Sequence, residues 1–308
     1  MSWFSLFRSH NKTLDPAPNP APNPELEHPW RPVTWSEDNK DQMLRKVKDF
    51  QPGTAEVSEL KILLYGPIGT GKSSLINSIN TVLQGHNTVT ALANSVHGQS
   101  HSFTLKFKTH RLKNAGPGSF YPFVFIDIMG LEDGSNGIQT NDINKILQGH
   151  VKDSYIFNPL KMIDKEDPNY IKHPDLKDRV HCLVSVLPAD KISMMSDKVM
   201  QKMRDVRQKA NDLGIPQVVV MPRVDISCPL VSRNPRKIYT SKKVKEKMKE
   251  CSHKLGVPMN CIYPVQNYYE QITNDMDMDI LILMAMTDIV RFANDYIEDQ
   301  VYNKSKPK

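Results

Sequence analysis

The chain has 308 residues, of which 39% are hydrophobic, and 40 Lys and Arg against 34 Asp and Glu give a formal net charge of +6. This length allows one large α/β domain or two small ones. The longest purely apolar run, 280–286, is far shorter than the roughly 20 residues of a bilayer span, which argues against a transmembrane segment. The four cysteines have no paired spacing, so we expect reduced thiols in a cytoplasmic protein.

The two ends of the chain differ from the rest in composition. Residues 1–35 are rich in proline and contain the tetrapeptide PAPN twice. Prolines at this density favour extended polyproline geometry and leave few backbone donors. We expect a disordered tail here, with a proline-binding protein partner as the alternative use of the segment. Residues 301–308 are also expected to be disordered.

Between these ends, across residues 36–300, helical and strand patterns alternate. A first amphipathic helix is expected to follow Ser36 and to end at Gln51-Pro52-Gly53. Strands are expected at 60–65, 102–112, 120–127, 180–187, 217–221 and 260–265, and helices at 73–83, 196–213, 241–255 and 275–299. This alternation predicts a mostly parallel sheet flanked by helices, a three-layer α/β fold. Residues 149–178 are expected to be an insertion between sheet units.

A phosphate-binding pattern follows the first strand directly. The pattern GxxxxGK[ST] is matched by Gly66, Pro67, Ile68, Gly69, Thr70, Gly71, Lys72 and Ser73, and we include the adjoining Ser74 in the same loop. Glycines allow such a loop to turn its amides toward a phosphate at a helix N-terminus. Lys72 is expected to contact the β- and γ-phosphates, and the Ser73 hydroxyl to ligate Mg²⁺. The sequence therefore predicts a P-loop NTPase fold.

A second motif, DxxG, ends the strand at 120–127. Asp127 is expected to hold Mg²⁺ through a water, and the Gly130 amide to bond a γ-phosphate oxygen. The following segment, 130–137, fits a switch that the γ-phosphate orders. A further Mg²⁺ ligand is expected from Ser100 or Ser102, around the start of the second strand.

Base recognition is expected at Met221-Pro222-Arg223-Val224-Asp225, where Ras-like G domains carry N-K-x-D. Asp225 is placed to accept two hydrogen bonds from guanine N1 and N2, which adenine cannot donate. Arg223 can stack on the base, and Asn267 or a neighbouring amide can contact guanine O6. In the alternative reading, Asp225 only caps a turn, which favours an ATP-preferring hydrolase.

At this point the chain resembles the interferon-induced protein 44 family, on the segments GPIGTGKSS, FIDIMGLED and PVQNYYE and on residues 83–87. The resemblance covers roughly residues 30–298. It implies a Ras-like G domain that binds GTP or GDP with Mg²⁺, in a cytoplasmic, interferon-induced protein of the antiviral immune response. Better-known members carry a separate domain ahead of this one, where this chain has its proline-rich segment.

Two residues indicate weak hydrolysis. Ras-like enzymes place a water-orienting Gln after DxxG, whereas this chain has Leu131. Ile68 adds bulk near the γ-phosphate. We expect slow GTP hydrolysis, or hydrolysis that depends on a homodimer formed through the nucleotide face. The alternative is a pseudo-GTPase scaffold that acts through partner binding.

One segment accounts for the net positive charge of the chain. Residues 233–254 hold nine Lys and Arg against two Glu. We expect this to be the solvated face of a helix, with binding of anionic lipid or nucleic acid as the alternative.

Overall fold

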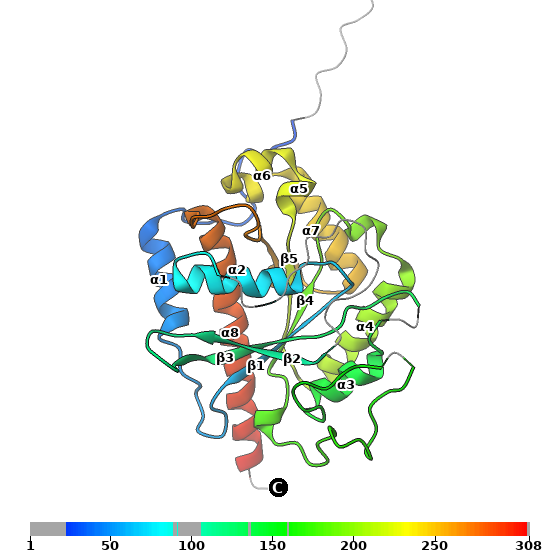
Figure 1. The fold of residues 1–308 in the computed structure, drawn as a ribbon. Coiled ribbons are helices and arrows are strands. Elements are labelled where there is room, and N and C mark those ends of the chain that lie inside the picture. The colour runs from blue at the N-terminus through cyan, green and yellow to red at the C-terminus, as the bar shows by residue number, and fades with distance from the viewer. Residues whose placement is uncertain (1–22, 89–90, 92–105, 135–136, 159, 307–308) are drawn as a thin grey trace, which may run out of the picture.

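The computed structural model describes residues 23–88, 91, 106–134, 137–158 and 160–306. Within these residues six strands form one sheet in the order β2-β3-β1-β4-β5-β6 (Figure 1). The strands are β1 (Leu60–Tyr65), β2 (Lys108–Lys113), β3 (Phe120–Asp127), β4 (Cys182–Val186), β5 (Gln217–Met221) and β6 (Ile262–Pro264). Every neighbouring pair is parallel except β2 and β3. The predicted mostly parallel sheet is confirmed.

Helices cover both faces of this sheet (Figure 1). One face carries α1 (Glu37–Lys48), α2 (Lys72–Gln84) and α8 (Met276–Ser305). The other carries α3 (Thr140–Leu147), α4 (Asp197–Asp212) and α7 (Lys242–Leu255), and two short helices, α5 (Val224–Ser227) and α6 (Pro229–Arg233), follow β5. Because both faces are covered, β1, β4 and β5 are almost entirely buried, in keeping with their mostly apolar sequences.

Side-chain caps set several of the helix starts. Ser36, Ser196 and Ser241 each accept a hydrogen bond from the amide three residues further on, at the beginnings of α1, α4 and α7. Asp275 caps α8 in the same way, accepting from the amides of Asp277 and Met278. These caps explain why the four helices begin within one residue of the expected starts.

The N-terminal segment departs from the expectation of a disordered tail as far as residue 35. The amide of Trp30 donates to the carbonyl of Tyr239, and the two rings meet edge to face with centroids 5.5 Å apart. The Arg31 guanidinium donates to the carbonyl oxygens of Met259 at 2.8 Å and Ile262 at 3.0 Å. Residues 23–35 therefore pack on the domain, because a tryptophan and an arginine supply contacts that proline content does not reveal. Residues 1–22 lie outside the described residues.

The expected C-terminal tail is also shorter than composition suggested. Helix α8 continues to Ser305, with Val301 against the core and Lys304 paired with Glu56 at 3.0 Å. Lys306 leaves the helical region, and it precedes Pro307, which disfavours helical geometry in the residue before it. The expectation of disorder is wrong for residues 301–305.

The insertion at 149–178 packs beside the sheet edge. Its Tyr155 carbonyl accepts from the Phe107 amide, and its Ser154 amide donates to the Phe107 carbonyl, just before β2. Phe157 and Ile163 within it are buried in the core. A short 3-10 helix at Leu176–Asp178 closes the insertion before β4.

Candidate functional site

The predicted site residues gather at one edge of the sheet. Five of the strands are parallel, so their carboxyl ends meet at the same edge, and the loops that leave β1, β3, β4, β5 and β6 all begin there. Three of these loops, those after β1, β5 and β6, come together at Gly71. A Cβ at Gly71 would lie 3.3 Å from Nδ2 of Asn267 and 3.9 Å from Cγ of Pro222.

The phosphate loop has the backbone geometry that its glycines allow. Gly69 and Gly71 have φ values of 69° and 94°, in the region that side chains disfavour. Gly66 has no room for a side chain, because a Cβ there would lie 2.5 Å from the Val186 carbonyl oxygen. The Thr70 hydroxyl donates to the Pro67 carbonyl at 3.0 Å and closes the turn. Helix α2 begins directly after Gly71, so the loop delivers its amides to a helix N-terminus.

Lys72 lies buried under this loop. Its side chain is 8% exposed, and Nζ donates to the carbonyl oxygens of Pro67 at 3.3 Å and Gly66 at 3.4 Å. Burial lowers the pKa of Lys72, and the charge of Asp127 opposes that shift. A phosphate on the loop would supply the counter-charge that this buried ammonium lacks.

Ser73 and Asp127 form the candidate metal pair. The Ser73 hydroxyl donates to Oδ2 of Asp127 at 2.6 Å. Oδ1 of the same carboxylate is buried and has no hydrogen-bond partner among the described residues. Mg²⁺ prefers oxygen ligands and retains several waters, so a hydroxyl and an unsatisfied carboxylate beside a phosphate loop fit that ion. No cluster of three or more His, Cys, Asp or Glu suited to a metal occurs in the described ranges.

The DxxG segment is joined to the phosphate loop by its main chain. The Leu131 amide donates to the Gly66 carbonyl at 3.0 Å, and the Ile68 amide donates to the Leu131 carbonyl at 3.3 Å. A Cβ at Gly130 would lie 2.6 Å from Cγ1 of Ile68, so only glycine fits there. The Leu131 side chain is 1% exposed and belongs to the core. Ile68 and Leu131, the two residues expected to weaken hydrolysis, therefore lie in segments that are hydrogen-bonded to each other.

At the expected base site, Arg223 makes an ion pair that the sequence did not predict. Its guanidinium lies 2.8 Å from Oδ2 of Asp190, in the loop after β4. Its backbone is left-handed, with φ at 63°, and the Pro222 carbonyl beside it accepts from the Ala189 amide at 2.9 Å. Asp190 lies four residues after the end of β4, and this position in a loop at the carboxyl edge of the sheet was the signal in the sequence that could have identified it.

Asp225 and Asn267 lie on two other loops of the same edge. Asp225 lies in the first turn of α5, where burial raises the pKa of its carboxyl while the backbone amides of Asp225 and Ile226 oppose the shift. Oδ1 of Asn267 is buried without a partner among the described residues. Asn267 thus carries hydrogen-bonding capacity beside Gly71, the last residue of the phosphate loop. Ser100 and Ser102, the expected further Mg²⁺ ligands, lie outside the described residues.

Several cations of the basic segment, residues 233–254, make contacts with other residues of the chain. Arg236 pairs with Asp277 at 2.8 Å, and Lys254 pairs with Glu250 at 3.2 Å. Lys245 lies over the Trp30 ring, 5.6 Å from its centroid. These contacts favour the solvated-face interpretation of 233–254. Separately, none of the described helices combines the length and the apolar character needed to cross a bilayer.

Comparison with known proteins gives relatives by sequence. The chain is 32% identical over 260 residues to human interferon-induced protein 44, and this covers 84% of the chain and 58% of that protein. It is 33% identical over 263 residues to human interferon-induced protein 44-like, covering 85% and 58%. The mouse interferon-induced protein 44 is 32% identical over 262 residues, covering 85% and 61%. The chain thus spans about three fifths of these relatives. No family model matches it.

Comparison with solved structures gives two weaker likenesses. One is Toc33 from Arabidopsis thaliana in complex with GDP and Mg²⁺, at 14% identity and a TM-score of 0.44, covering 84% of this chain and 91% of that one. The other is a probable GTP-binding protein engB, at 12% identity and a TM-score of 0.38, covering 75% and 98%. The sequence relatives carry the assignment: over the region that it shares with them, the chain belongs to the interferon-induced protein 44 family.

Proposed function

We propose that this chain binds guanine nucleotide together with Mg²⁺ and serves as a nucleotide-gated switch in the interferon-induced, antiviral response. The observation that carries the proposal is the Ser73–Asp127 pair, with its unsatisfied Oδ1, beside a glycine-rich loop and a buried lysine. Lys72 and the loop amides would hold the phosphates, and Ser73 and Asp127 would hold the metal. The metal, when bound, neutralises charge on the β- and γ-phosphates.

Guanine selection is assigned to Asp225, with Arg223 and Asn267 around the base. The partial burial of Asp225 supports this, because a desolvated carboxylate discriminates strongly between a base that donates to it and one that does not. The γ-phosphate would be sensed at Gly130, whose segment is hydrogen-bonded to the phosphate loop through Leu131. Release of those main-chain bonds would be the switching event.

Calorimetry with GTP, GDP and ATP in the presence of Mg²⁺ tests the proposal. We expect both guanine nucleotides to bind and ATP to bind at least about a hundred-fold more weakly, as buried polar discrimination gives in comparable sites. Lys72→Ala should abolish binding of all three. Absence of any purine nucleotide binding by the folded wild-type chain would refute the proposal.

Asp225→Asn separates guanine recognition from the ATP-preferring alternative. A carboxamide presents a donor where guanine N1 and N2 also donate, so GTP binding should weaken while xanthosine triphosphate binding strengthens. Asp212→Asn, at the end of α4 and outside the site, is the matched control and should leave all affinities unchanged. An ATP-binding protein would be indifferent to Asp225→Asn, and that result would favour the alternative.

The remaining proposals concern hydrolysis, location and partners. Hydrolysis is proposed to be slow or to depend on a homodimer formed through the nucleotide face, because Leu131 is buried and cannot orient water. A pseudo-GTPase scaffold is the second candidate, favoured by the same residue. Cytoplasmic location is supported by four cysteines that are free thiols. A proline-binding partner for the N-terminal segment, and an anionic partner for residues 233–254, stay proposals.

A further inference from the structure

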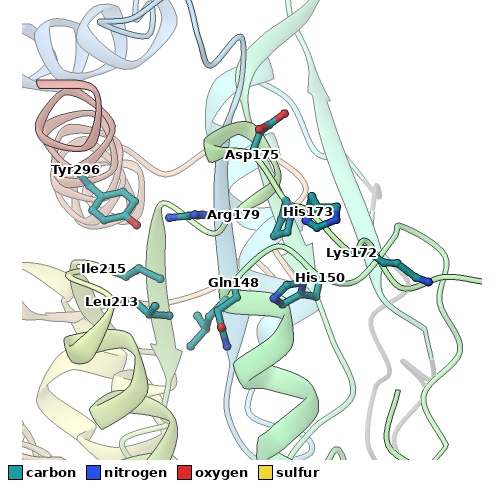
Figure 2. A pocket seen from close by; sticks show the side chains of 11 residues that line it. Gln148, His150, Lys172, His173, Asp175, Arg179, Leu213, Ile215 and Tyr296 are labelled. Atoms are coloured by element: carbon teal, nitrogen blue, oxygen red, sulfur yellow. The ribbon is translucent and has the colours of Figure 1, made fainter. Parts of the chain in front are cut away.

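A cavity lies at the edge of the sheet opposite the phosphate loop. Its volume is about 400 Å³, and it opens between the end of α3, residues 172–179, the turn from α4 to β5, and α8 (Figure 2). Arg179 precedes β4 and Ile215 precedes β5, so the cavity is at the amino ends of the parallel strands. The candidate nucleotide site is at their carboxyl ends. The insertion at 149–178 supplies one wall of this cavity through His150 and His173.

The cavity lining holds two cations, Lys172 and Arg179, and one carboxylate, Asp175, and no ion pair joins them among the described residues. Arg179 is half-buried and hydrogen-bonds to Tyr296, and it makes no ion pair with any carboxylate in the described ranges. Asp175 is the acidic residue of the lining, and its carboxylate is engaged by the Asp178 amide in the cap of the 3-10 helix. Lys172 extends away from the other labelled side chains (Figure 2). A partly desolvated guanidinium therefore faces the cavity with donors to spare.

Two further features of the lining, a fixed histidine ring and an apolar wall, bear on which ligand the cavity could bind. The Nδ1 atom of His150 donates to the Ile171 carbonyl at 2.8 Å, and its ring stacks on Tyr170 with centroids 4.8 Å apart. These contacts fix the ring with its Nδ1 proton on the carbonyl, so His150 shapes this wall and Arg179 is the group that would meet an anion. Opposite, Leu213 and Ile215 give the lining an apolar part (Figure 2). A guanidinium without an ion pair and an apolar wall suit a ligand with one anionic end and one apolar end.

We propose that this cavity binds a small organic anion, with a phosphate or carboxylate group at Arg179 and an apolar body against Leu213 and Ile215. The site is separate from the phosphate loop and does not depend on the proposed function. The role of the insertion is then to complete the wall of the site with His150 and His173. Arg179 is suited to the anionic end because its planar donors match either group bidentately.

Methyl NMR of the full chain tests the proposal, with Ile215 and Leu213 as local reporters. Phenyl phosphate and benzoate are titrated in parallel with benzyl alcohol, which has the same apolar body and no charge. We expect one or both anions to shift the Ile215 methyl signals saturably and benzyl alcohol to leave them in place. Which anion binds more tightly identifies phosphate or carboxylate as the natural group.

Variants locate the binding. Arg179→Met should weaken anion binding about ten-fold or more, as loss of a charge-assisted hydrogen bond does. Arg179→Lys keeps the charge and should retain part of the affinity, and its melting temperature checks folding. Lys177→Met removes an exposed charge two residues away, outside the lining, and should change nothing. Lys72→Ala should also leave the Ile215 response intact.

Several results would overturn the proposal. One is an Ile215 signal that neither anion moves. Another is equal weakening by Arg179→Met and Lys177→Met, which would reveal diffuse charge attraction rather than a site. A response that is lost in Lys72→Ala and kept in Arg179→Met would place the anion on the phosphate loop instead.

Discussion

His181 shows how a single polar side chain is accommodated in this core. The residue is fully buried just before β4. Its Nδ1 accepts from the Lys61 amide at 2.9 Å, and its Nε2 donates to the Leu176 carbonyl at 2.9 Å. Both ring nitrogens are therefore satisfied in the neutral form, and the ring connects β1 to the end of the insertion. Protonation would remove the acceptor that Lys61 uses.

This arrangement predicts a loss of stability in mild acid. Burial lowers the pKa of His181 to about 4, against an ordinary value near 6.5. Between these values the unfolded chain binds a proton that the folded chain excludes, so the His181 contribution is complete above about pH 6.5 and is lost as pH falls toward 4. From about pH 7.5 to about pH 5 we expect a loss of about 2 kcal/mol in the free energy of unfolding.

Urea unfolding at the two pH values measures this loss. His181→Gln should be less stable than wild type at the higher pH and should show a smaller drop on acidification. His253→Gln, which changes an exposed histidine on α7, should keep the wild-type drop. If His181→Gln lost as much stability in acid as the wild type does, titration of His181 would not be the cause.

The Asp190–Arg223 pair predicts a positioning role for Asp190. Because Oδ2 holds the guanidinium at 2.8 Å, Asp190→Asn should leave Arg223 less ordered beside the base site. We expect guanine nucleotide affinity to fall about three- to ten-fold, the range of a partly exposed charged hydrogen bond. Asp299→Asn, on the exposed side of α8, is the control.

A double-mutant cycle distinguishes this role from a general charge effect. If Asp190 acts through Arg223, the double variant Asp190→Asn/Arg223→Met should bind nucleotide no more weakly than Arg223→Met alone. Additive losses would show that the two side chains contribute independently. The isothermal titration used for GTP and GDP provides the measurement.

Between elements, Tyr268 joins the loop after β6 to two helices. Its hydroxyl donates to Oδ1 of Asp279 at 2.7 Å and accepts from the Asp275 amide at 2.8 Å, at the start of α8. Its own amide donates to the Ser78 hydroxyl of α2 at 2.9 Å. The preceding residue is Asn267, beside Gly71. The network therefore fixes a candidate base-contacting residue against the helix that the phosphate loop begins.

Removing one hydroxyl tests this connection between elements. Tyr268→Phe keeps the ring but leaves the Asp279 carboxylate, 4% exposed, without its tyrosine donor. We expect a loss of about 1–3 kcal/mol in unfolding free energy and a several-fold loss of guanine nucleotide affinity. Tyr269→Phe is the matched control, because that neighbouring side chain is 77% exposed. A stable Tyr268→Phe variant with unchanged affinity would show that the network does not position Asn267.

How far the sequence predicts these elements depends on the range of the interactions that form them. The strands at 120–127 and 217–221 are as expected, because local apolar pattern alone defines a buried strand. The short helix α5 and the ion pair of Arg223 with Asp190 were not expected, since they depend on how loops from β4 and β5 meet. Trp30 was missed for the same reason: its partner Tyr239 lies about two hundred residues away in sequence.

For the whole molecule, some features of the candidate site could be predicted from the sequence and others could not. The phosphate loop and DxxG could be placed from sequence because each motif lies directly after a strand. Their joining through Gly66, Ile68 and Leu131 could not, because it is a contact between two loops that the parallel sheet brings together. The candidate nucleotide site lies at the carboxyl edge of the parallel strands and the cavity lies at their amino edge. Helix α8 contacts both regions, through Asp279 beside Tyr268 and through Tyr296 in the cavity lining.

The buried Leu131 leads to a prediction about the molecule in solution. The proposed site would supply phosphate, metal and base contacts, while the buried Leu131 side chain after DxxG offers no hydrogen bond to an attacking water. If a second copy supplies the missing group across the nucleotide face, the hydrolysis rate per molecule should rise with protein concentration. Single-turnover GTP hydrolysis, measured from nanomolar to micromolar protein, should therefore be slow when dilute and faster when concentrated.

Two variants serve as controls for this hydrolysis measurement. Lys72→Ala should remain inactive at every concentration, which excludes a contaminating hydrolase. Leu131→Gln should not restore activity, because the amide would enter a core position that is 1% exposed rather than the nucleotide site. Rapid hydrolysis by the wild type at nanomolar concentration would show that one copy already holds a complete catalytic set. A rate that stays slow at all concentrations, with GTP bound, would favour the scaffold over the dimer-dependent enzyme.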